Sequence, residues 1–336
     1  MGRKKVIIVG GTGLLGYHAA LEFLKKEWEV HSLSIEDLDL EGWYPEEIRV
    51  HQADVLHMDH AGLSALFRGM DAMVYAMGPD DRIPPRAPAW KFFREKLVET
   101  SIRVFEAAGD AGVKRAVLLG SYLDYFQRQM PRLRMIRRHP YIRARAEQSD
   151  ALIGLSGKGM DVLVLELPYV FGTMPGRVPL WKEVFLDRFL KLNPVIYPDG
   201  GTAVVCAESV GMAVVGAVER GEAGRRYPIG DVNMRWREIF TIMFDALGEK
   251  RRFVHIPHWI AALAGHWLMW KERRKNREPG LHLAYIFKDV ISREFFLDAS
   301  HSMEELAYAP CDVHAAITQT ALACYPNGYM KERKYQ

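Results

Sequence analysis

The chain has 336 residues, of which 49% are hydrophobic and 26% are charged. This length and composition are typical of a globular protein with a sizeable core, built as one large α/β unit or as two lobes. The formal net charge of +3 is too small to indicate a nucleic-acid-binding protein. Cys206, Cys311 and Cys324 are far apart in the sequence, so they predict neither a disulfide framework nor a metal site.

The N-terminus lacks the pattern of a secretory signal, because a short apolar run at residues 6–9 leads directly into a glycine loop. The longest apolar segment, residues 258–270, is shorter than the roughly 20 residues that a membrane-spanning helix needs. We therefore expect a cytoplasmic protein.

Short apolar segments alternate with helical patterns through the first half of the chain. Strands are predicted at residues 6–9, 29–33, 48–52, 72–76, 116–119 and 161–167, and helices at 15–26, 61–68, 90–111 and 141–154. This alternation predicts right-handed βαβ crossovers and a parallel sheet with helices on both faces. The expected fold is a doubly wound, Rossmann-type α/β fold.

The alternation ends after Pro168. Residues 172–200 are rich in proline, glycine and aromatic residues, and residues 232–336 have a mostly helical pattern. We therefore expect a dinucleotide-binding domain at residues 1–168. A smaller, mostly helical substrate-binding lobe should follow at 169–336, with some of its segments returning to the sheet.

A glycine-rich loop joins the first predicted strand to the first predicted helix. In such loops the first glycine allows a tight turn, the second lets backbone N–H groups approach a pyrophosphate, and the third packs the helix on the strand. The positive end of the helix dipole also favours phosphate there. The loop therefore predicts a binding site for NAD or NADP that is formed by Gly10, Thr12, Gly13, Leu14, Leu15 and Gly16.

Two further cofactor contacts are expected at the ends of later strands. Asp54 and Val55 follow the third strand, where a carboxylate can contact the adenine. Ser34 ends the second strand, where an acidic residue would select NAD and an arginine would select NADP. Serine selects neither, and we interpret the following Glu36 and Asp37 as exposed loop charges. The choice of cofactor stays open.

Four segments together resemble the extended branch of the short-chain dehydrogenase/reductase superfamily. This branch includes sugar-nucleotide epimerases and dehydratases, dihydroflavonol reductases and hydroxysteroid dehydrogenases. The segments are the glycine loop, residues 113–121, residues 167–172 and the closing passage 296–310. The resemblance implies a homodimer formed through the helices at 90–111 and 141–154. It also implies cofactor contacts from Ala76, Met77, Gly78, Pro168, Tyr169 and Val170.

The same resemblance implies a catalytic set of Ser121, Tyr141 and Arg145. In this family a tyrosine transfers a proton, a serine orients the substrate carbonyl, and a lysine four residues after the tyrosine holds the nicotinamide ribose. Residues 141 and 145 share one helix face, but residue 145 is arginine here. Arginine supplies a cation and is always protonated, so it cannot relay a proton as lysine can. Glu166 and Leu97 also depart from the family pattern, which has arginine and asparagine there.

The leading hypothesis is an NAD(P)-dependent reductase or dehydrogenase acting on a carbonyl/alcohol pair in a small molecule. Trp236, Trp259, Trp267 and Trp270 favour a hydrophobic substrate. The apolar segment 258–270 is expected to roof the substrate pocket rather than lie on a membrane surface. Two alternatives stay open: a sugar-nucleotide epimerase or dehydratase, and a sensor or scaffold that binds the dinucleotide without turnover, which Arg145 motivates.

An arginine-rich segment precedes and overlaps the catalytic helix. It could bind a phosphate, carboxylate or coenzyme A group, and a solvated surface loop is an equal alternative. Its seven arginines are Arg128, Arg132, Arg134, Arg137, Arg138, Arg143 and Arg145. Because aromatic residues are not interleaved with them, no nucleic-acid partner is expected. Three scattered histidines, His255, His258 and His266, are interpreted as structural, so no metal is expected.

Overall fold

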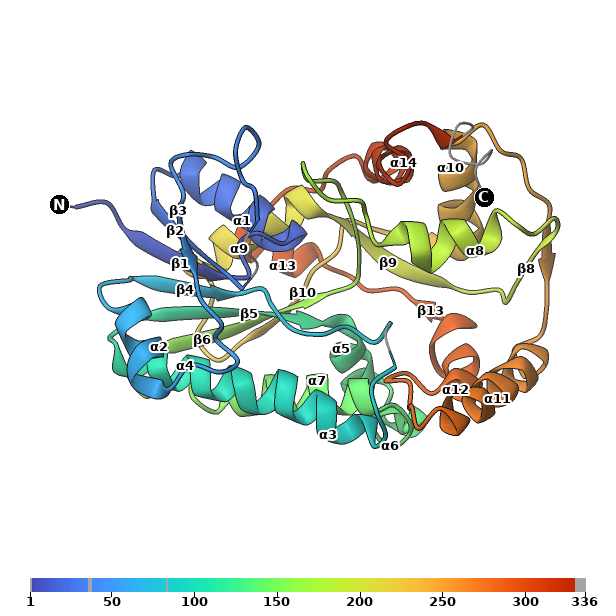
Figure 1. The fold of residues 1–336 in the computed structure, drawn as a ribbon, viewed down its shortest axis with the longest axis horizontal. Coiled ribbons are helices and arrows are strands. Elements are labelled where there is room, and N and C mark those ends of the chain that lie inside the picture. The colour runs from blue at the N-terminus through green and yellow to red at the C-terminus, as the bar shows by residue number, and fades with distance from the viewer. Residues whose placement is uncertain (1, 36–37, 83, 330–336) are drawn as a thin grey trace.

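The computed structural model describes residues 2–35, 38–82 and 84–329. Its central sheet has the strand order β10-β6-β5-β4-β1-β2-β3, and every pair in it is parallel (Figure 1). The strands are β1 (Lys5–Val9), β2 (Glu29–Ser34), β3 (Arg49–Gln52), β4 (Ala72–Tyr75), β5 (Arg115–Ser121), β6 (Asp161–Leu167) and β10 (Arg226–Pro228). The order reverses at β1, so the predicted doubly wound α/β fold is confirmed.

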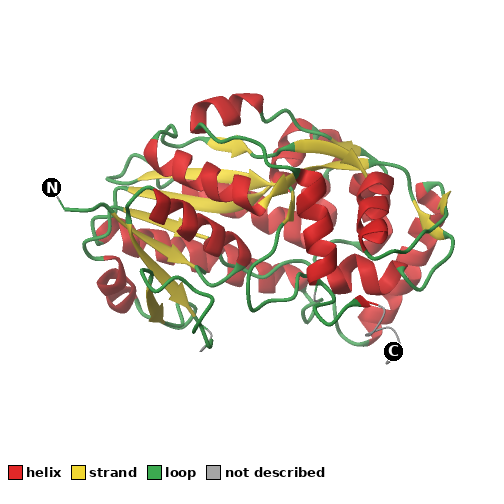
Figure 2. Cartoon of the chain, turned by 90° about the horizontal axis from the view of Figure 1, so that it is seen from above, coloured by secondary structure: helices red, strands yellow, loops and turns green. Residues whose placement is uncertain are grey.

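Helices cover both faces of this sheet (Figure 2). Alternate side chains of β1 enter opposite cores, since Val6 and Ile8 pack on one face and Ile7 and Val9 on the other. Burial on both faces explains why these strands read as continuous apolar runs. The helices of the first face are α1 (Leu14–Lys25) and α9 (Ala207–Glu219), and those of the second are α2 (His60–Phe67), α4 (Thr100–Asp110) and α7 (Pro140–Ile153).

The helix predicted at 90–111 is one continuous segment with a widened middle. It consists of α3 (Ala89–Phe93), the π-helical η1 (Arg94–Glu99) and α4. Helix α5 (Tyr122–Gln129) was not predicted, and it follows β5 without an intervening loop. The short η2 (Pro131–Leu133) and α6 (Met135–Arg138) then lead into α7.

The second lobe contains short strands that the sequence pattern did not indicate. Its main sheet is built on β9 (Gly201–Cys206), which pairs with β7 (Tyr169–Phe171), β11 (Val232–Arg235) and β13 (Glu294–Phe295). A separate parallel pair joins β8 (Val195–Tyr197) to β12 (Phe253–His255). Strands this short carry too few residues to establish an alternation in the sequence.

Helices surround these strands. They are η3 (Lys182–Leu186), α8 (Asp187–Phe189), α10 (Trp236–Ala246), α11 (His258–Arg274), α12 (Leu283–Ile286), η4 (Phe287–Ile291), α13 (Ser300–Leu306) and α14 (Val313–Ala323). Residues 207–228 return to the first sheet, where α9 packs against α1 and β10 pairs with β6. Within the described residues, no helix is long and apolar enough to cross a membrane.

Candidate active site

The glycine loop leaves no room for side chains at two of its positions. Gly10 has a φ of +88°, and a Cβ there would lie 2.9 Å from the carbonyl oxygen of Ala76. A Cβ on Gly16 would lie 2.3 Å from the carbonyl oxygen of Gly10. Gly13 caps the N-terminus of α1, and its Cβ position meets only the Gly10 carbonyl oxygen, at 3.4 Å. The loop therefore needs glycine at 10 and 16 for packing, whereas position 13 faces open space.

A cavity of about 360 Å³ lies above this loop, at the carboxyl ends of β1, β2 and β4. Predicted cofactor residues that line it are Gly10, Thr12, Gly13, Ser34, Val55, Ala76, Met77 and Gly78. The Thr12 hydroxyl donates to Ser34 Oγ at 2.9 Å, which ties the loop to the end of β2. Glu36 and Asp37 lie outside the described residues.

Other predicted cofactor residues lie off this cavity. Asp54 is turned into its own loop, where its carboxylate accepts from the Leu56 N–H at 2.9 Å and contacts His57 Nδ1 at 2.5 Å. Leu14, Leu15 and Gly16 form the first turn of α1. Pro168, Tyr169 and Val170 lie where the chain leaves β6 and enters β7.

The cavity fits a dinucleotide. Parallel strands end there, the N-terminus of α1 points into it, and the open space at Gly13 lets backbone approach a phosphate. Arg177 also lines the cavity, from the loop between β7 and η3. Sequence reasoning missed Arg177, because only the fold brings this distant loop over the first lobe.

Ser121 ends β5 and caps α5. Its side chain accepts from the Leu123 N–H at 3.3 Å, and its strand register pairs it with Leu167. Ser121 therefore lies next to the β6–β7 connection that carries Pro168. The cap explains why a helix can start immediately after the strand.

Tyr141 and Arg145 are in direct contact on α7. Arg145 Nε donates to the phenolic oxygen of Tyr141 at 3.0 Å, and the guanidinium carbon lies 5.2 Å from the ring centroid. Arg145 Nη1 donates to Gln148 Oε1 at 3.0 Å, and the amide of Gln148 donates to the Leu97 carbonyl oxygen at 3.1 Å. The widened η1 segment thus holds Gln148, which in turn orients Arg145.

A buried network fixes the N-terminus of α7 just before Tyr141. Arg138 Nη1 donates to Asp289 Oδ1 at 2.8 Å, and His139 Nε2 lies 3.3 Å from Asp289 Oδ2. His139 Nδ1 accepts the backbone N–H of His282 at 3.0 Å, so Nε2 carries the ring proton and donates to Asp289. Bonds from Arg138 and His139 outweigh burial and lower the pKa of Asp289.

The loop after β4 brings two further charged residues to the site. The Asp81 carboxylate interacts electrostatically with Arg145 and with Tyr169. Burial raises the pKa of Asp81. The Arg82 guanidinium interacts electrostatically with Tyr141 and with Glu183, which belongs to the second lobe. Sequence reasoning missed Asp81 and Arg82, although they follow Gly78 by only a few residues.

Glu166 and Asp124 form a buried acid pair beneath the site. Arg128 lies between them, 2.5 Å from Glu166 Oε1 and 2.6 Å from Asp124 Oδ2. Burial raises the pKa of Glu166 to about 7 and also raises the pKa of Asp124, against the opposing effect of Arg128. Glu166 departs from the family pattern, and Arg128 supplies the opposite charge from α5.

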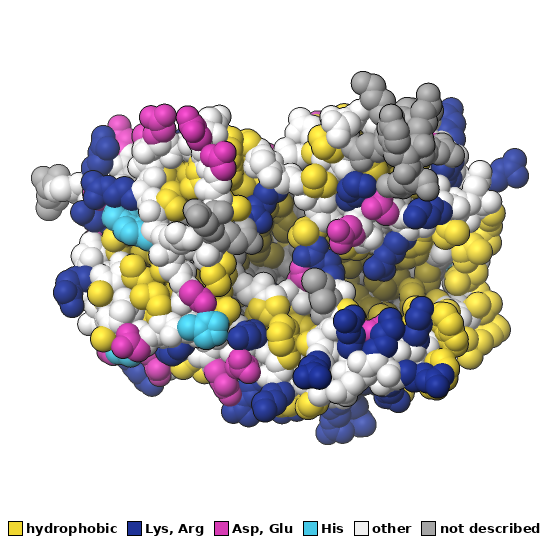
Figure 3. All heavy atoms as spheres, viewed as in Figure 1, with side chains coloured by type: hydrophobic (Ala, Val, Ile, Leu, Met, Phe, Trp, Pro, Cys, Tyr) yellow, Lys and Arg dark blue, Asp and Glu magenta, His cyan; other side chains and the backbone are white. Residues whose placement is uncertain are grey.

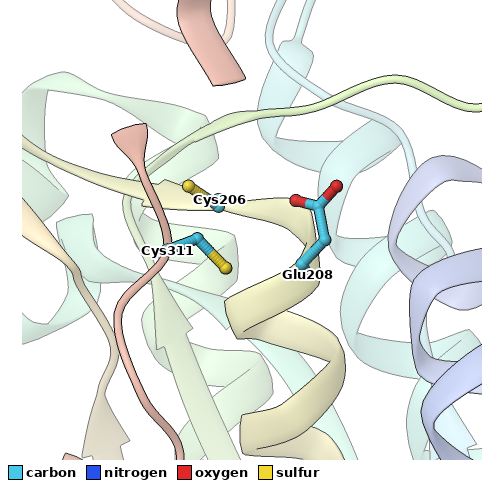
Figure 4. A group of neighbouring side chains, drawn as sticks. All are labelled: Cys206, Glu208 and Cys311. Atoms are coloured by element: carbon cyan, nitrogen blue, oxygen red, sulfur yellow. The ribbon is translucent and has the colours of Figure 1, made fainter. Parts of the chain in front are cut away.

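Two of the scattered cysteines are brought together with Glu208 (Figure 4). One ligand atom from each of Cys206, Glu208 and Cys311 lies within 4.8 Å of the others. In this view the Cys206 thiol points away from Glu208, and the pKa of Cys206 is raised by burial and by Asp231. A separate cavity of about 250 Å³ near Asp231 contains none of the predicted site residues.

The three tryptophans of the segment 258–270 do not form the expected closed roof over a substrate pocket, and Trp236, which also predicted a hydrophobic substrate, lies elsewhere. Trp236 is buried, and its indole N–H donates to the Ile291 carbonyl oxygen at 2.8 Å. Trp259, Trp267 and Trp270 are exposed on α11 instead. Their helix packs on the protein through Ala261, Gly265 and Met269 on its opposite face, which the apolar pattern alone does not reveal.

A family model for the NAD-dependent epimerase/dehydratase family matches residues 6–230. The chain belongs to this family. The match covers the glycine loop, Ser121, Tyr141 and the return of residues 207–228 to the sheet. The resemblance to extended short-chain dehydrogenases is confirmed. The predicted cofactor class, a nicotinamide dinucleotide, is also confirmed, because the family is NAD-dependent. No curated protein matches the chain by sequence.

Solved structures of epimerases and dehydratases share the fold along the whole chain. A nucleoside-diphosphate-sugar epimerase from Pseudomonas aeruginosa is 17% identical, with 97% of this chain and 98% of that chain covered and a TM-score of 0.69. DesIV, a dTDP-glucose 4,6-dehydratase from Streptomyces venezuelae with NAD bound, is 20% identical, with 98% of each chain covered and a TM-score of 0.65. The enzyme WbmG from Bordetella bronchiseptica, in complex with NAD, is 18% identical, with 97% and 95% covered and a TM-score of 0.67.

Proposed function

We propose that this member of the family is an NAD(P)-dependent oxidoreductase that interconverts a carbonyl and an alcohol, with Tyr141 as the proton-transfer group. The bond from Arg145 Nε to the Tyr141 oxygen, at 3.0 Å, carries the proposal. Arginine has no acceptor atom, so the phenolic proton is not engaged by Arg145. That proton is available to a substrate oxygen, which is what a general acid requires.

Arg145 also serves the reverse direction, in which the deprotonated oxygen of Tyr141 accepts the proton of an alcohol. A permanent cation that donates to the phenolic oxygen stabilises the negative charge that develops there during proton transfer. Gln148 and the Leu97 carbonyl fix the guanidinium in this position. Arg145 therefore replaces the electrostatic role of the family's lysine without relaying a proton, and we assign it to the nicotinamide ribose as well.

The residues that line the cavity over the glycine loop would hold the cofactor. When bound, NAD(P) supplies the hydride donor or acceptor. Thr12 and Gly13 would contact the pyrophosphate, Ser34 the adenosine ribose, and Pro168 the nicotinamide end. Ser121, at the adjacent end of β5, would orient the substrate oxygen toward Tyr141.

A hydrophobic substrate is supported by the aromatic residues that adjoin Ser121. Tyr122 follows it directly, and its ring lies 6.1 Å from that of Tyr169. Tyr169 in turn stacks on Trp181 at 5.6 Å and contacts Trp236 edge-on at 5.0 Å. Tyr122 and Trp236 are buried, whereas Tyr169 and Trp181 are partly exposed, and it is these two rings that would favour an apolar ligand.

A sugar-nucleotide epimerase or dehydratase is the second candidate. It is favoured by the names of solved structures that share the fold of this chain. Such enzymes use the same hydride and proton groups, so the site geometry serves both reactions. A non-catalytic, dinucleotide-binding protein is the third. We also propose a cytoplasmic homodimer whose interface includes α4 and α7.

Turnover assays separate these three candidates. The purified protein should oxidise NADH or NADPH in the presence of aliphatic or aromatic ketones, which is followed at 340 nm. Epimerisation or dehydration of UDP- and dTDP-hexoses without net cofactor oxidation would favour the second candidate. Tight binding of NADH without turnover of either substrate panel would refute both enzymatic candidates.

A further inference from the structure

Helix α11 presents its large apolar side chains to solvent. Trp259 is 57% exposed, Leu263 62%, Trp267 58% and Trp270 53%. Their spacing of four, four and three residues places them on one face of the helix. Lone exposed apolar residues are ordinary on protein surfaces, whereas a continuous stripe of this size marks an interaction surface.

The opposite face of α11 packs on the rest of the protein. Ala261, Gly265 and Met269 are buried. A Cβ on Gly265 would lie 2.3 Å from the Leu283 carbonyl oxygen, so the helix approaches α12 too closely for any side chain there. The helix is thus held with its tryptophans facing solvent. Rotation of α11 about its axis could not bury them, because only Gly265 allows the close contact with α12.

Basic residues flank the apolar stripe. Between residues 258 and 277 the chain has five basic residues and one acidic residue, Glu272. Lys271 Nζ lies 5.5 Å from the Trp267 ring, and the Arg274 guanidinium lies 4.6 Å from the Trp270 ring. Glu272 is mostly buried and lies 3.7 Å from Lys275 Nζ, so the exposed surface is basic.

The arginine-rich segment extends this basic surface. Arg138 stacks over Tyr285 of α12 at 4.8 Å, which places α6 beside α12. Arg132, Arg134 and Arg137 are exposed on the same segment. In Figure 3 dark-blue side chains gather beside the hydrophobic patch at the lower right, where Figure 1 places α6, α11 and α12.

We propose that α11 docks this protein on an anionic phospholipid surface, with the helix lying parallel to the membrane. Tryptophan and leucine would enter the interfacial region while lysine and arginine contact the phosphates, as in interfacial amphipathic helices. A second copy fits less well, because a symmetric contact through α11 would bring the same basic residues face to face. The proposal is independent of the reaction that the site performs.

Co-sedimentation of the full-length protein with vesicles tests the proposal. Vesicles containing phosphatidylglycerol should bind the protein more tightly than phosphatidylcholine vesicles, and added salt should weaken the binding. Brominated lipids should quench part of the tryptophan fluorescence, because three of the eight tryptophans lie on α11. Failure to bind anionic vesicles would overturn the proposal.

Leu263→Ser should weaken vesicle binding about tenfold. Lys271→Ala should weaken it about fivefold, and only on anionic vesicles. Leu322→Ser is the matched control, because Leu322 is half exposed on α14, far from the stripe in sequence, and should leave binding unchanged. Equal binding by Leu263→Ser and wild type would refute the assignment to α11. So would a dimer in light scattering that Leu263→Ser dissociates, since a second copy would then cover the stripe.

Discussion

At the residue scale, Gly13 and Gly16 differ in what a side chain would meet. Position 13 is open, whereas a Cβ at position 16 would collide with the Gly10 backbone. We therefore expect Gly13→Asp to fold and to lose dinucleotide affinity by about 100-fold or more, because its charge would face the pyrophosphate. Titration calorimetry with NADH and NADPH measures this loss and also shows which cofactor is preferred.

Gly13→Ala and Gly16→Ala serve as the paired comparisons. Gly13→Ala should keep wild-type stability and weaken cofactor binding less than Gly13→Asp does, because it adds a methyl group without a charge. Gly16→Ala should lose about 1–3 kcal/mol of unfolding free energy through overpacking. A folded Gly13→Asp protein that binds NADH as wild type does would refute the cofactor site.

The raised pKa of Glu166 predicts a specific pH dependence of the free energy of unfolding. Burial raises its pKa from 4.5 to about 7, so the unfolded chain releases this proton at lower pH than the folded chain. The free energy of unfolding should consequently fall by about 3 kcal/mol as the pH rises from about 4.5 to 7, and then level. Urea titrations across this pH range give the slope.

Glu166→Gln should remove that part of the slope, because the amide does not titrate. Glu147→Gln changes an exposed carboxylate on α7 and should leave the slope as in wild type. If Glu166→Gln and wild type show the same pH dependence, another group such as Asp124 is responsible and the raised pKa of Glu166 is wrong.

At the element scale, the buried network of Asp289 holds the N-terminus of α7 in place. Asp289→Ala would leave Arg138 without its buried partner and remove the acceptor of His139. Loss of one partner from such a network should cost about 3–5 kcal/mol of unfolding free energy, as measured by chemical denaturation.

The exposed pair of Arg143 and Glu147 on the same helix gives a direct contrast. Its Nε···Oε1 distance is 2.8 Å, but the two side chains are 47% and 40% exposed and so remain in contact with solvent. Glu147→Gln should therefore cost less than about 1 kcal/mol. Equal destabilisation by Asp289→Ala and Glu147→Gln would show that burial of the network does not matter.

The sequence predicted the elements of the first half because buried parallel strands and amphipathic helices leave clear periodic patterns. It also predicted that Tyr141 and Arg145 share a face, since helix geometry fixes the spacing. It could not predict that Nε contacts the phenol, because this depends on Gln148 and on the Leu97 carbonyl of a different helix. Similarly, Arg177 and Asp81 reach the site through loops whose paths are set by tertiary packing.

At the scale of the whole molecule, the two lobes are interleaved rather than joined by a linker. Residues 207–228 return to the first sheet, and His18 of α1 contacts the Thr173 carbonyl oxygen at 2.9 Å. The Tyr141 N–H also donates to the Gly280 carbonyl oxygen at 3.0 Å. Unfolding one lobe would therefore disrupt the other.

Differential scanning calorimetry should accordingly show one unfolding transition with matching calorimetric and van't Hoff enthalpies. Saturating NADH should raise the temperature of this single transition, because ligand bound to the folded state stabilises it. Two separate transitions, only one of which responds to NADH, would contradict the interleaved arrangement.

The central claim is that Tyr141 transfers the proton and that Arg145, through its bond to the phenolic oxygen, stabilises the charge that develops there. Steady-state kinetics of Tyr141→Phe with the best ketone substrate tests this claim most directly. We predict a loss of kcat of about 10²–10⁴-fold with NADH affinity nearly unchanged, because the phenol acts mainly in the transition state. Arg145→Lys should keep turnover, whereas Arg145→Met should lose most of it. A Tyr141→Phe enzyme with the wild-type kcat would contradict the account.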